Sequence, residues 1–320
     1  MVFPTIPATN GASGNAVATR QIAFIIQEHE AGTRLDRLLA AHAGVGRKRV
    51  RELFAAGEVR IGSRRPSAGE PARAGDEVSC ELEEEAPEPD AALPLDVRFE
   101  HPEFVVVEKP AGQPSAPLAA GERGTLCNAL VARFPEMAGI GYRPREPGLV
   151  HRLDTQTSGL LLCARSGGAF TALKDALSSG ALHKRYLALS EDRGLPAQGV
   201  IERPIGPDPR RPERVLVYDT VPSERYARAA LTRFHVLERR GGLLLLELEA
   251  PHAVRHQIRA HLCSVGHPIL GDVVYGSGKH PALAERHALH ASYIAWAGDG
   301  TLPSFEVRSE LPEELLRLFA

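Results

Sequence analysis

The sequence predicts an α+β fold with a mixed, largely antiparallel sheet and flanking helices. Apolar runs typical of strands dominate the chain beyond its first third, at 104–107, 160–163, 186–189 and 243–248. Apolar residues at helical spacing lie between them, at 126–133 and 169–177. Because the helices do not alternate strictly with the strands, the pattern disfavours a doubly wound parallel sheet.

Composition places the chain among ordinary globular proteins. Its 320 residues suffice for one large and one small domain, and 43% are hydrophobic and 24% charged. No apolar run approaches the roughly 18 residues that span a bilayer, and the first 20 residues lack the pattern of a secretory signal. The cysteines form no C-x-x-C pair, which predicts reduced thiols in a cytoplasmic setting and neither a disulfide framework nor a zinc site: Cys80, Cys127, Cys163 and Cys263.

Charge is distributed unevenly along the chain, although the net charge is only −2. Residues 31–78 contain ten Lys or Arg and six Asp or Glu, whereas residues 79–90 contain six acids and no base. The acidic, proline-containing stretch cannot build a core and is expected to be extended. We therefore expect a disordered tail, a small basic domain, an acidic linker and a large domain, at 1–20, 21–82, 83–94 and 95–320.

The small basic domain shows two helical patterns followed by a short strand. Residues 34–41 and 47–55 have apolar residues at helical spacing, and Gly57 is expected to end the second helix. Arg47, Lys48 and Arg51 cluster on the polar side of that helix, because residues three and four apart are neighbours.

This order resembles the small RNA-binding domain named after ribosomal small-subunit protein S-four. The matching motifs are Arg34-Leu35-Asp36, the basic helix, Gly57-x-Val59-x-Ile61 and Ala74-Gly75-Asp76. The resemblance implies that Arg47, Lys48 and Arg51 contact RNA phosphates. A basic helix face that is merely solvated is the alternative.

The stretch from His151 to Leu161 is the most informative part of the large domain. Residues 149–153 read as a strand, 157–159 as a turn and 160–162 as a second strand. On a strand, Arg152 and Asp154 leave on the same face, which places an acid at a rim open to ligands. A buried Arg–Asp pair that braces a hairpin is the structural alternative.

The motif H-R-L-D-x-x-T-S-G-L-L in this stretch resembles the signature of the RluA-type pseudouridine synthases. Further blocks occur in the order found in that family, from about residue 104 to residue 291. They are Glu108-Lys109-Pro110-Ala111-Gly112, Gly124-Thr125-Leu126, Lys184-x-Tyr186-x-Ala188, His256-Gln257-Ile258-Arg259-x-His261 and Gly266-His267-Pro268-Ile269-Leu270-Gly271-Asp272. The resemblance implies the pseudouridine synthase fold and isomerisation of uridine in structured RNA, with Asp154 as the catalytic residue.

The resemblance also implies roles for other residues in the reaction. An ionised Asp154 acts either as a nucleophile or as a base on the sugar, and the sequence leaves both open. Arg259 matches the arginine that pairs with the catalytic aspartate, and Tyr186 offers a flat face for the uracil and a hydroxyl near the C5 proton. The isomerisation involves no redox step and no hydrolysis, so neither cofactor nor metal is expected.

RNA contacts are expected around this site. Arg152 and Lys109 are candidates for gripping phosphates, and Gln257 and Arg255 are expected to contact RNA. The family arginine that precedes His-Gln-Ile-Arg is replaced here by Val254, and an arginine stands one place later. Ribosomal RNA is favoured over transfer RNA, because an additional basic domain suits a large folded substrate, and no obligate protein partner is implied.

Two other functions compete with this interpretation. One is a catalytically inactive RNA-binding or ribosome-assembly factor on the same scaffold, which needs no acid in its pocket. The other is a metal-dependent hydrolase, because His252 and His256 stand four residues apart as helical zinc ligands do. The glutamate of H-E-x-x-H is absent, which disfavours the hydrolase.

Overall fold

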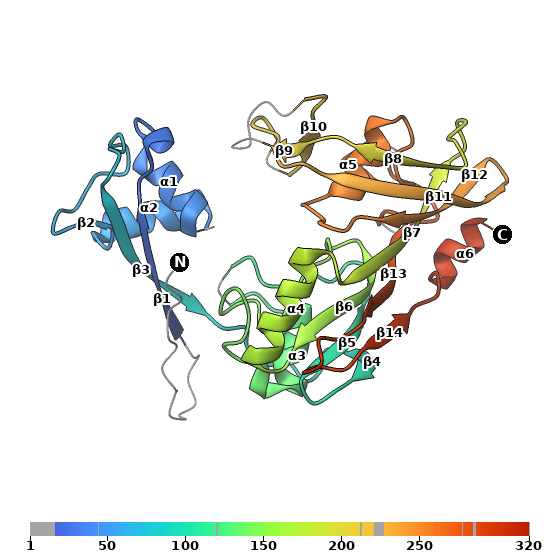
Figure 1. The fold of residues 1–320 in the computed structure, drawn as a ribbon, viewed down its shortest axis with the longest axis horizontal. Coiled ribbons are helices and arrows are strands. Elements are labelled where there is room, and N and C mark those ends of the chain that lie inside the picture. Colours follow the sequence, from blue (N-terminus) through green and yellow to red (C-terminus); the bar gives the residue numbers. More distant parts are fainter. Residues whose placement is uncertain are drawn as a thin grey trace. The chain divides into compact units, whose positions relative to one another are not determined.

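The computed structural model describes residues 17–43, 45–119, 121–211, 213–220, 227–276, 278–283 and 286–319. The chain divides into two compact units, Met1–Ala86 and Pro87–Ala320. Figure 1 shows both units.

The N-terminal unit packs two helices on a small antiparallel sheet. Strands β1 (Val17–Ile25), β3 (Glu77–Glu85) and β2 (Arg60–Ile61) lie in that order, next to a 3-10 turn at Glu28–Glu30. Helices α1 (Leu35–Ala43) and α2 (Arg47–Ala56) confirm the two predicted helices. Gly57 ends α2 in the left-handed conformation, with φ of 69°, which favours glycine.

Two boundaries of this unit differ from the prediction. Val17–Arg20 form the start of β1 and pair with β3, so the predicted tail is wrong for these residues, and the rest of it lies outside the described residues. The predicted linker is also too long, because β3 continues to Glu85 and the Glu88 carbonyl accepts a hydrogen bond from Asn128 of the larger unit. Strand pairing uses backbone groups, which are available in an acidic stretch as in any other.

The larger unit is built on a nine-stranded sheet with the order β4-β5-β6-β13-β7-β12-β11-β8, and β14 also pairs with β13. The strands are β4 (Asp96–Glu100), β5 (Phe104–Lys109), β6 (Ser158–Ala164), β7 (His183–Glu191), β8 (Gln198–Glu202), β11 (Leu231–Arg240), β12 (Leu243–Glu249), β13 (Leu289–Trp296) and β14 (Phe305–Arg308). Among the described pairs only β6 and β13 are parallel, which confirms the predicted mixed, largely antiparallel sheet.

Helices cover both faces of the sheet near β5 and β6. Helix α3 (Leu126–Arg133) shares a core with Val105 and Leu161, whereas α4 (Gly167–Ser179) shares another with Val106 and Leu162. Every residue of β6 is therefore buried, as its unbroken apolar run indicates. Both helices lie where the sequence predicts them.

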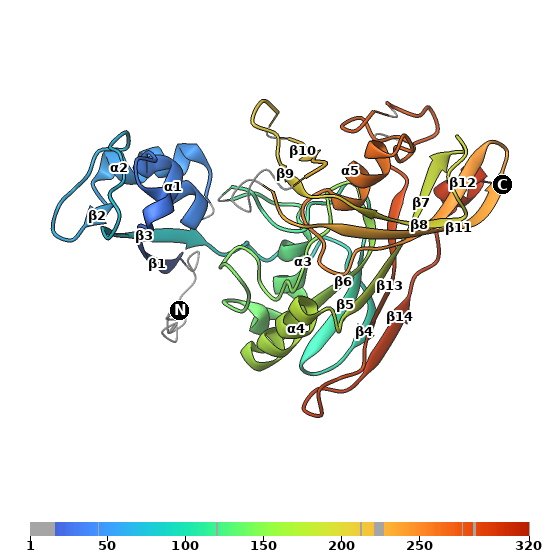
Figure 2. The ribbon, with the colours of Figure 1, turned by 45° about the horizontal axis from the view of Figure 1, so that its top comes forward.

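The remaining elements complete the larger unit in Figures 1 and 2. They are the 3-10 turn Pro135–Met137, the hairpin of β9 (Ile205–Pro207) and β10 (Val215–Val217), and helices α5 (Gln257–Ser264) and α6 (Glu313–Phe319). No helix in the described part is long and apolar enough to cross a membrane.

The segment before β6 is a loop and not the predicted strand. Leu149 makes a single bridge to Cys163, and the Val150 amide donates to the Leu162 carbonyl. The chain then leaves the sheet, because β13 takes the place beside the first residues of β6. At Gly159 a Cβ would lie 2.2 Å from the Ala291 carbonyl oxygen, so this close approach requires glycine.

Candidate active site

A cavity of about 930 Å³ opens in the larger unit, between the loop before β6, strand β7 and the start of α5. Asp154, Tyr186 and Arg259 line it together, although they are far apart in the sequence. Arg152 and Arg255 also line it. The structure therefore brings the three residues predicted as catalytic to one place.

The loop that carries Asp154 is fixed by buried hydrogen bonds. The Ser115 hydroxyl donates to the Leu153 carbonyl at 2.8 Å and accepts from the Leu153 amide at 3.2 Å. The Lys109 ammonium donates to the carbonyls of Pro110, Gln113 and Thr155. Asp154 is thus held on a rigid loop, with its side chain about one quarter exposed.

Lys109 braces this loop and does not meet the role predicted for it. Its side chain is fully buried. Burial disfavours the charged form and lowers the pKa of its ammonium to about 7. A buried ammonium with three backbone acceptors cannot reach an RNA phosphate, so the predicted phosphate contact is wrong.

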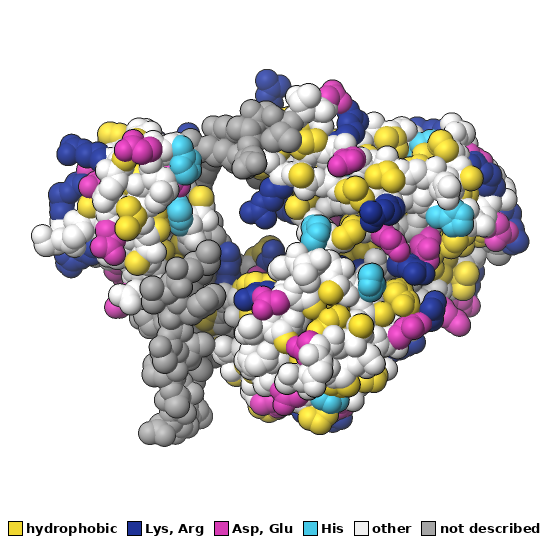
Figure 3. Space-filling model, in the orientation of Figure 1, with side chains coloured by type: hydrophobic (Ala, Val, Ile, Leu, Met, Phe, Trp, Pro, Cys, Tyr) yellow, Lys and Arg dark blue, Asp and Glu magenta, His cyan; other side chains and the backbone are white. Residues whose placement is uncertain are grey.

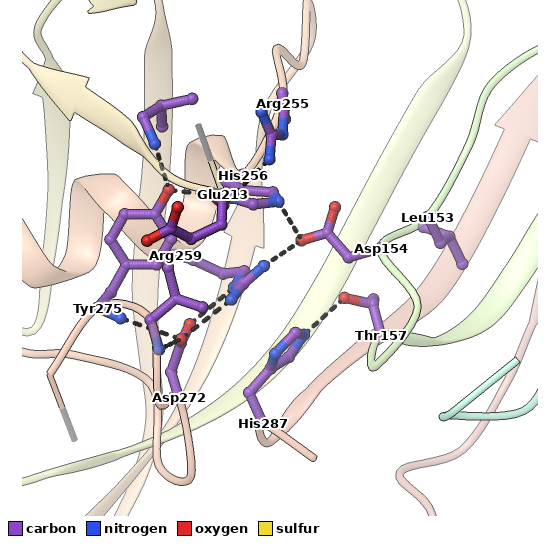
Figure 4. A network of polar contacts seen from close by, with 12 residues as sticks. Leu153, Asp154, Thr157, Glu213, Arg255, His256, Arg259, Asp272, Tyr275 and His287 are labelled. Carbon is purple, nitrogen blue, oxygen red and sulfur yellow. Dashed lines mark hydrogen bonds and ion pairs between the residues drawn. The ribbon is translucent and has the colours of Figure 1, made fainter. Parts of the chain in front are cut away.

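Arg259 joins Asp154 to a second, fully buried carboxylate. Its Nη1 donates to Asp154 Oδ2 at 2.6 Å, while Nε and Nη2 donate to the two oxygens of Asp272 at 2.7 and 3.0 Å (Figure 4). Burial by itself raises the pKa of Asp272, but the bonds from Arg259 outweigh it and hold that pKa below its ordinary value. The bidentate bond to Asp272 therefore orients the guanidinium toward Asp154.

The two groups that face Asp154 approach the same oxygen. His256 Nε2 lies 3.8 Å from Oδ2, the atom that also accepts from Arg259. Among the described residues no group bonds Oδ1, and Figure 4 shows that oxygen turned away from both partners. The arrangement leaves one carboxylate oxygen free to react.

His256 is held in an unusual backbone conformation. It precedes α5 with φ of 56°, and no other described non-glycine residue has positive φ. Burial lowers the pKa of its ring to about 4, so the ring is neutral at pH 7. Backbone strain of this kind is concentrated at functional sites.

The hydroxyl of Tyr275 determines which nitrogen of His256 carries the proton. That hydroxyl accepts a bond from the Val215 amide at 2.9 Å and lies 3.0 Å from His256 Nδ1. Its own hydrogen is then available to Nδ1, so the neutral ring carries its hydrogen on Nε2, toward Asp154. His256 Nε2 therefore faces Asp154 beside Arg259, at 3.8 Å and without a hydrogen bond in this structure.

Tyr186 forms a largely buried wall of the site. It is 6% exposed and pairs in the sheet with Leu248 on one side and Ala291 on the other. A small cavity of about 70 Å³ lies between its side chain, Asp154 and Leu289. Burial, and then the charge of Asp154, raise the pKa of the phenol, so its hydroxyl stays protonated.

The residues predicted to bind RNA around the cavity have different surroundings. Arg152 is largely exposed and pairs with Glu146 rather than Asp154, which excludes the braced Arg–Asp hairpin. Arg255 is exposed and donates to the Glu213 carbonyl. Gln257 is buried and bonded to the Leu231 carbonyl and the Thr232 hydroxyl, so its predicted RNA contact is wrong.

In the N-terminal unit, the predicted basic face is described only in part. The side chains of Arg47 and Lys48 lie outside the described residues, whereas Arg51 is exposed. Figure 3 shows Lys and Arg side chains gathered along one edge of this unit. Arg64 and Arg65 are also exposed.

Sequence reasoning did not single out Asp272, His256 or Tyr275 as parts of one network. Asp272 and Tyr275 stand in the closing motif, and His256 in H-Q-I-R, but only the fold brings them to Asp154. In the described part of the chain no group of three or more His, Cys, Asp or Glu could hold a metal ion.

The stability of the fold is expected to depend on pH because of two buried histidines, His287 and His290. Burial lowers the pKa of His287 to about 3 and that of His290 to about 4, so both are neutral when folded. An unfolded histidine takes up a proton below about pH 6.5. Stability is therefore complete above that pH, and the free energy of unfolding falls toward pH 4 by about 1.4 kcal/mol per pH unit for each histidine.

Urea unfolding at pH 7, 6 and 5, followed by the single tryptophan, Trp296 of β13, measures this slope. His290→Gln should make the slope shallower. The same slope in both proteins would show that His290 is not neutral in the fold.

Comparisons with known proteins agree with this geometry. Residues 103–264 match the family model described as "RNA pseudouridylate synthase". An "uncharacterized RNA pseudouridine synthase" from Chloroflexus aurantiacus is 38% identical, over 91% of this chain and 90% of that protein. "Ribosomal large subunit pseudouridine synthase D" from Xylella fastidiosa is 32% identical, over 92% and 90%.

A solved structure shares the fold. The chain named "Human RNA Pseudouridylate Synthase Domain Containing 1" aligns with a TM-score of 0.53 and 26% identity, over 70% of this chain and 86% of that one. The family match, the relatives and the cavity with its paired aspartate lead to one conclusion: this chain belongs to the RNA pseudouridylate synthase family.

Proposed function

We propose that this enzyme isomerises uridines in large-subunit ribosomal RNA, with Asp154 as its catalytic residue. The observation that carries the role of Asp154 is its carboxylate in the cavity: Arg259 and His256 face Oδ2, and no described residue bonds Oδ1. A purely RNA-binding protein has no use for such a carboxylate. The ribosomal substrate rests on the printed names of relatives such as the Xylella protein.

The proposed reaction uses the residues of the cavity in order. The uridine is flipped out of its stack at a cost of a few kcal/mol. Asp154 Oδ1 then attacks the sugar or removes a proton from it, and the N1–C1′ bond breaks. The released uracil turns against Tyr186 until C5 faces C1′. A C5–C1′ bond then forms as the bond from Asp154 to C1′ breaks or, on the elimination route, as Asp154 returns the proton to the sugar. C5 finally loses its proton and N1 gains one.

The substrate is tested by mapping pseudouridines in total RNA from cells with and without this chain. The proposal expects a missing pseudouridine in large-subunit ribosomal RNA. A missing pseudouridine in transfer RNA alone would overturn the substrate and leave the enzyme class intact.

His256 is proposed to orient Asp154 through its Nε2 hydrogen. His256→Phe keeps a ring but removes both nitrogens, and it should lower kcat by up to about 10-fold, because the ring nitrogen that faces Asp154 is lost. His256→Gln keeps a donor near the Nε2 position and should retain most activity. Single-turnover rates across pH 6–9 check this role, and equal rates for His256→Phe and the parent would contradict it.

The N-terminal unit is proposed to bind structured RNA as an S-four-type domain. Replacing Arg47, Lys48 and Arg51 with Ala should weaken binding to long structured RNA and flatten its salt dependence. Each lost phosphate contact removes about 0.7–0.9 from the slope of log K against log salt. The chemical rate at saturating RNA should survive, because Asp154 lies in the other unit.

Slopes measured on a long RNA and on a short stem-loop that fills only the catalytic cavity test the domain. The triple variant should differ from the parent mainly on the long RNA. An unchanged slope there would mean that this face is merely solvated.

A further inference from the structure

Lys184 is a buried cation that has no counterion among the described residues. It stands two residues before Tyr186 on β7, so both side chains project from the same face of the strand, and both line the cavity. Lys184 is 9% exposed, and it makes no hydrogen bond or ion pair with any described residue. Lys109, which is also buried, has three carbonyl acceptors.

The side chain of Lys184 lines the cavity. The fully buried polar side-chain atoms that lack a partner in the described part belong to Gln113, His151 and Arg214, and Lys184 Nζ is not among them. Burial lowers the pKa of Lys184 to about 8, which leaves the ammonium largely charged at pH 7.

The side chain of His151 also lines the cavity, and one of its ring nitrogens has no partner among the described residues. The Leu162 amide donates to His151 Nε2 at 3.3 Å, so the neutral ring carries its hydrogen on Nδ1. Nδ1 is buried and has no acceptor among the described residues. Burial, and then the charge of Lys184, lower the pKa of His151 and keep the ring neutral.

Lys184 is thus a charged group that lines the cavity, and no acid among the described residues pairs with it. Leaving a buried cation without a partner is costly, and a ligand that brings an anion removes that cost. An RNA substrate carries such an anion at every phosphodiester. Along a strand two residues span about 7 Å, so an anion at Lys184 would lie about one nucleotide from a base held at Tyr186.

We propose that Lys184 forms a binding site for a backbone phosphate next to the flipped uridine. The proposal rests on the RNA uridine isomerase activity and not on which RNA is modified. It assigns Lys184 to substrate binding rather than to the support of Asp154.

The test combines protein variants with a modified RNA. Lys184→Met keeps the length of the side chain and removes its charge, and Lys184→Arg restores a cation. Arg185→Met is the matched control, since Arg185 precedes Tyr186 on the opposite face of β7 and pairs with Glu249. The RNA is a stem-loop that the parent enzyme modifies, made with neutral methylphosphonates at single positions around the target uridine.

Lys184→Met should lower RNA affinity about 10-fold or more, because a bond to a charged group is lost. It should also reduce the salt slope by about 0.7, whereas Lys184→Arg should recover most of both. One methylphosphonate position should weaken the parent but not Lys184→Met, which is the coupling expected of direct contact.

Additive effects of Lys184→Met and the methylphosphonate at every position would overturn the phosphate site. An unchanged salt slope in Lys184→Met, with the Tm of the parent retained, would overturn it equally. Turnover of the unmodified stem-loop by the parent reports separately on the enzyme and its substrate, so a failure of the proposed RNA is told apart from a failure of this site.

Discussion

Asp154→Asn is expected to abolish pseudouridine formation, by about 10³-fold or more, while RNA affinity stays within a few-fold of the parent. The amide keeps the shape of the carboxylate but can neither attack the sugar nor take a proton from it. The fold should tolerate the change, because Arg259 keeps both of its bonds to Asp272. Single-turnover rates and equilibrium binding on the true substrate measure the two effects separately.

Asp96→Asn is the matched control for this experiment. Asp96 is an exposed residue of β4 that does not line the cavity, so its change should leave the rate untouched. Turnover retained by purified Asp154→Asn would remove Asp154 from the chemistry. A parallel loss of affinity would indicate that Asp154 binds RNA instead.

Arg259→Lys is expected to lower both the chemical rate and the stability. The guanidinium uses three nitrogens on two carboxylates, and an ammonium cannot reproduce this planar fork. Asp272, which is 1% exposed, would lose its bidentate partner, and breaking a buried pair in this way costs about 3–5 kcal/mol. The rate should fall about 100-fold, because Asp154 loses the group that orients it.

Urea unfolding and saturating single-turnover rates check Arg259→Lys. Arg239→Lys is the control, since Arg239 pairs with Asp192 at the surface and its change should cost no more than about 1 kcal/mol. Adding Asp272→Asn should relieve part of the lost stability without restoring the rate. Stability equal to that of the parent would show that the Arg259–Asp272 pair does not hold the site.

Local sequence patterns predicted those helices and strands whose burial is visible in their own residues. Apolar residues at helical spacing predict α3 and α4, because each helix buries one side. The unbroken apolar run predicts β6, because that strand is buried on both faces. The segment 149–153 has the same apolar character, yet it forms a loop. Strand β13 takes its place beside β6, and no local sequence pattern predicts that pairing.

For the site, too, the sequence identified important residues but not all of their contacts. Motif resemblance singled out Asp154, Tyr186 and Arg259, and the fold brings them to one cavity. It also suggested RNA contacts for Lys109 and Gln257, which are buried and bonded inside the protein. A motif marks a residue as important but does not tell whether its polar group faces a ligand or the backbone.

The sequence by itself determined the family and the mixed sheet, and it singled out Asp154, Tyr186 and Arg259 as candidates for the chemistry. Only the tertiary structure decided that Asp272 contacts Arg259 and Tyr275 contacts His256. It also decided that no described residue bonds one oxygen of Asp154 and that Lys184 lines the cavity with no counterion among the described residues. The physical reason is that partners of a buried polar group are chosen by distance in space. Asp154 and Arg259 are 105 residues apart in the chain and 2.6 Å apart in the fold.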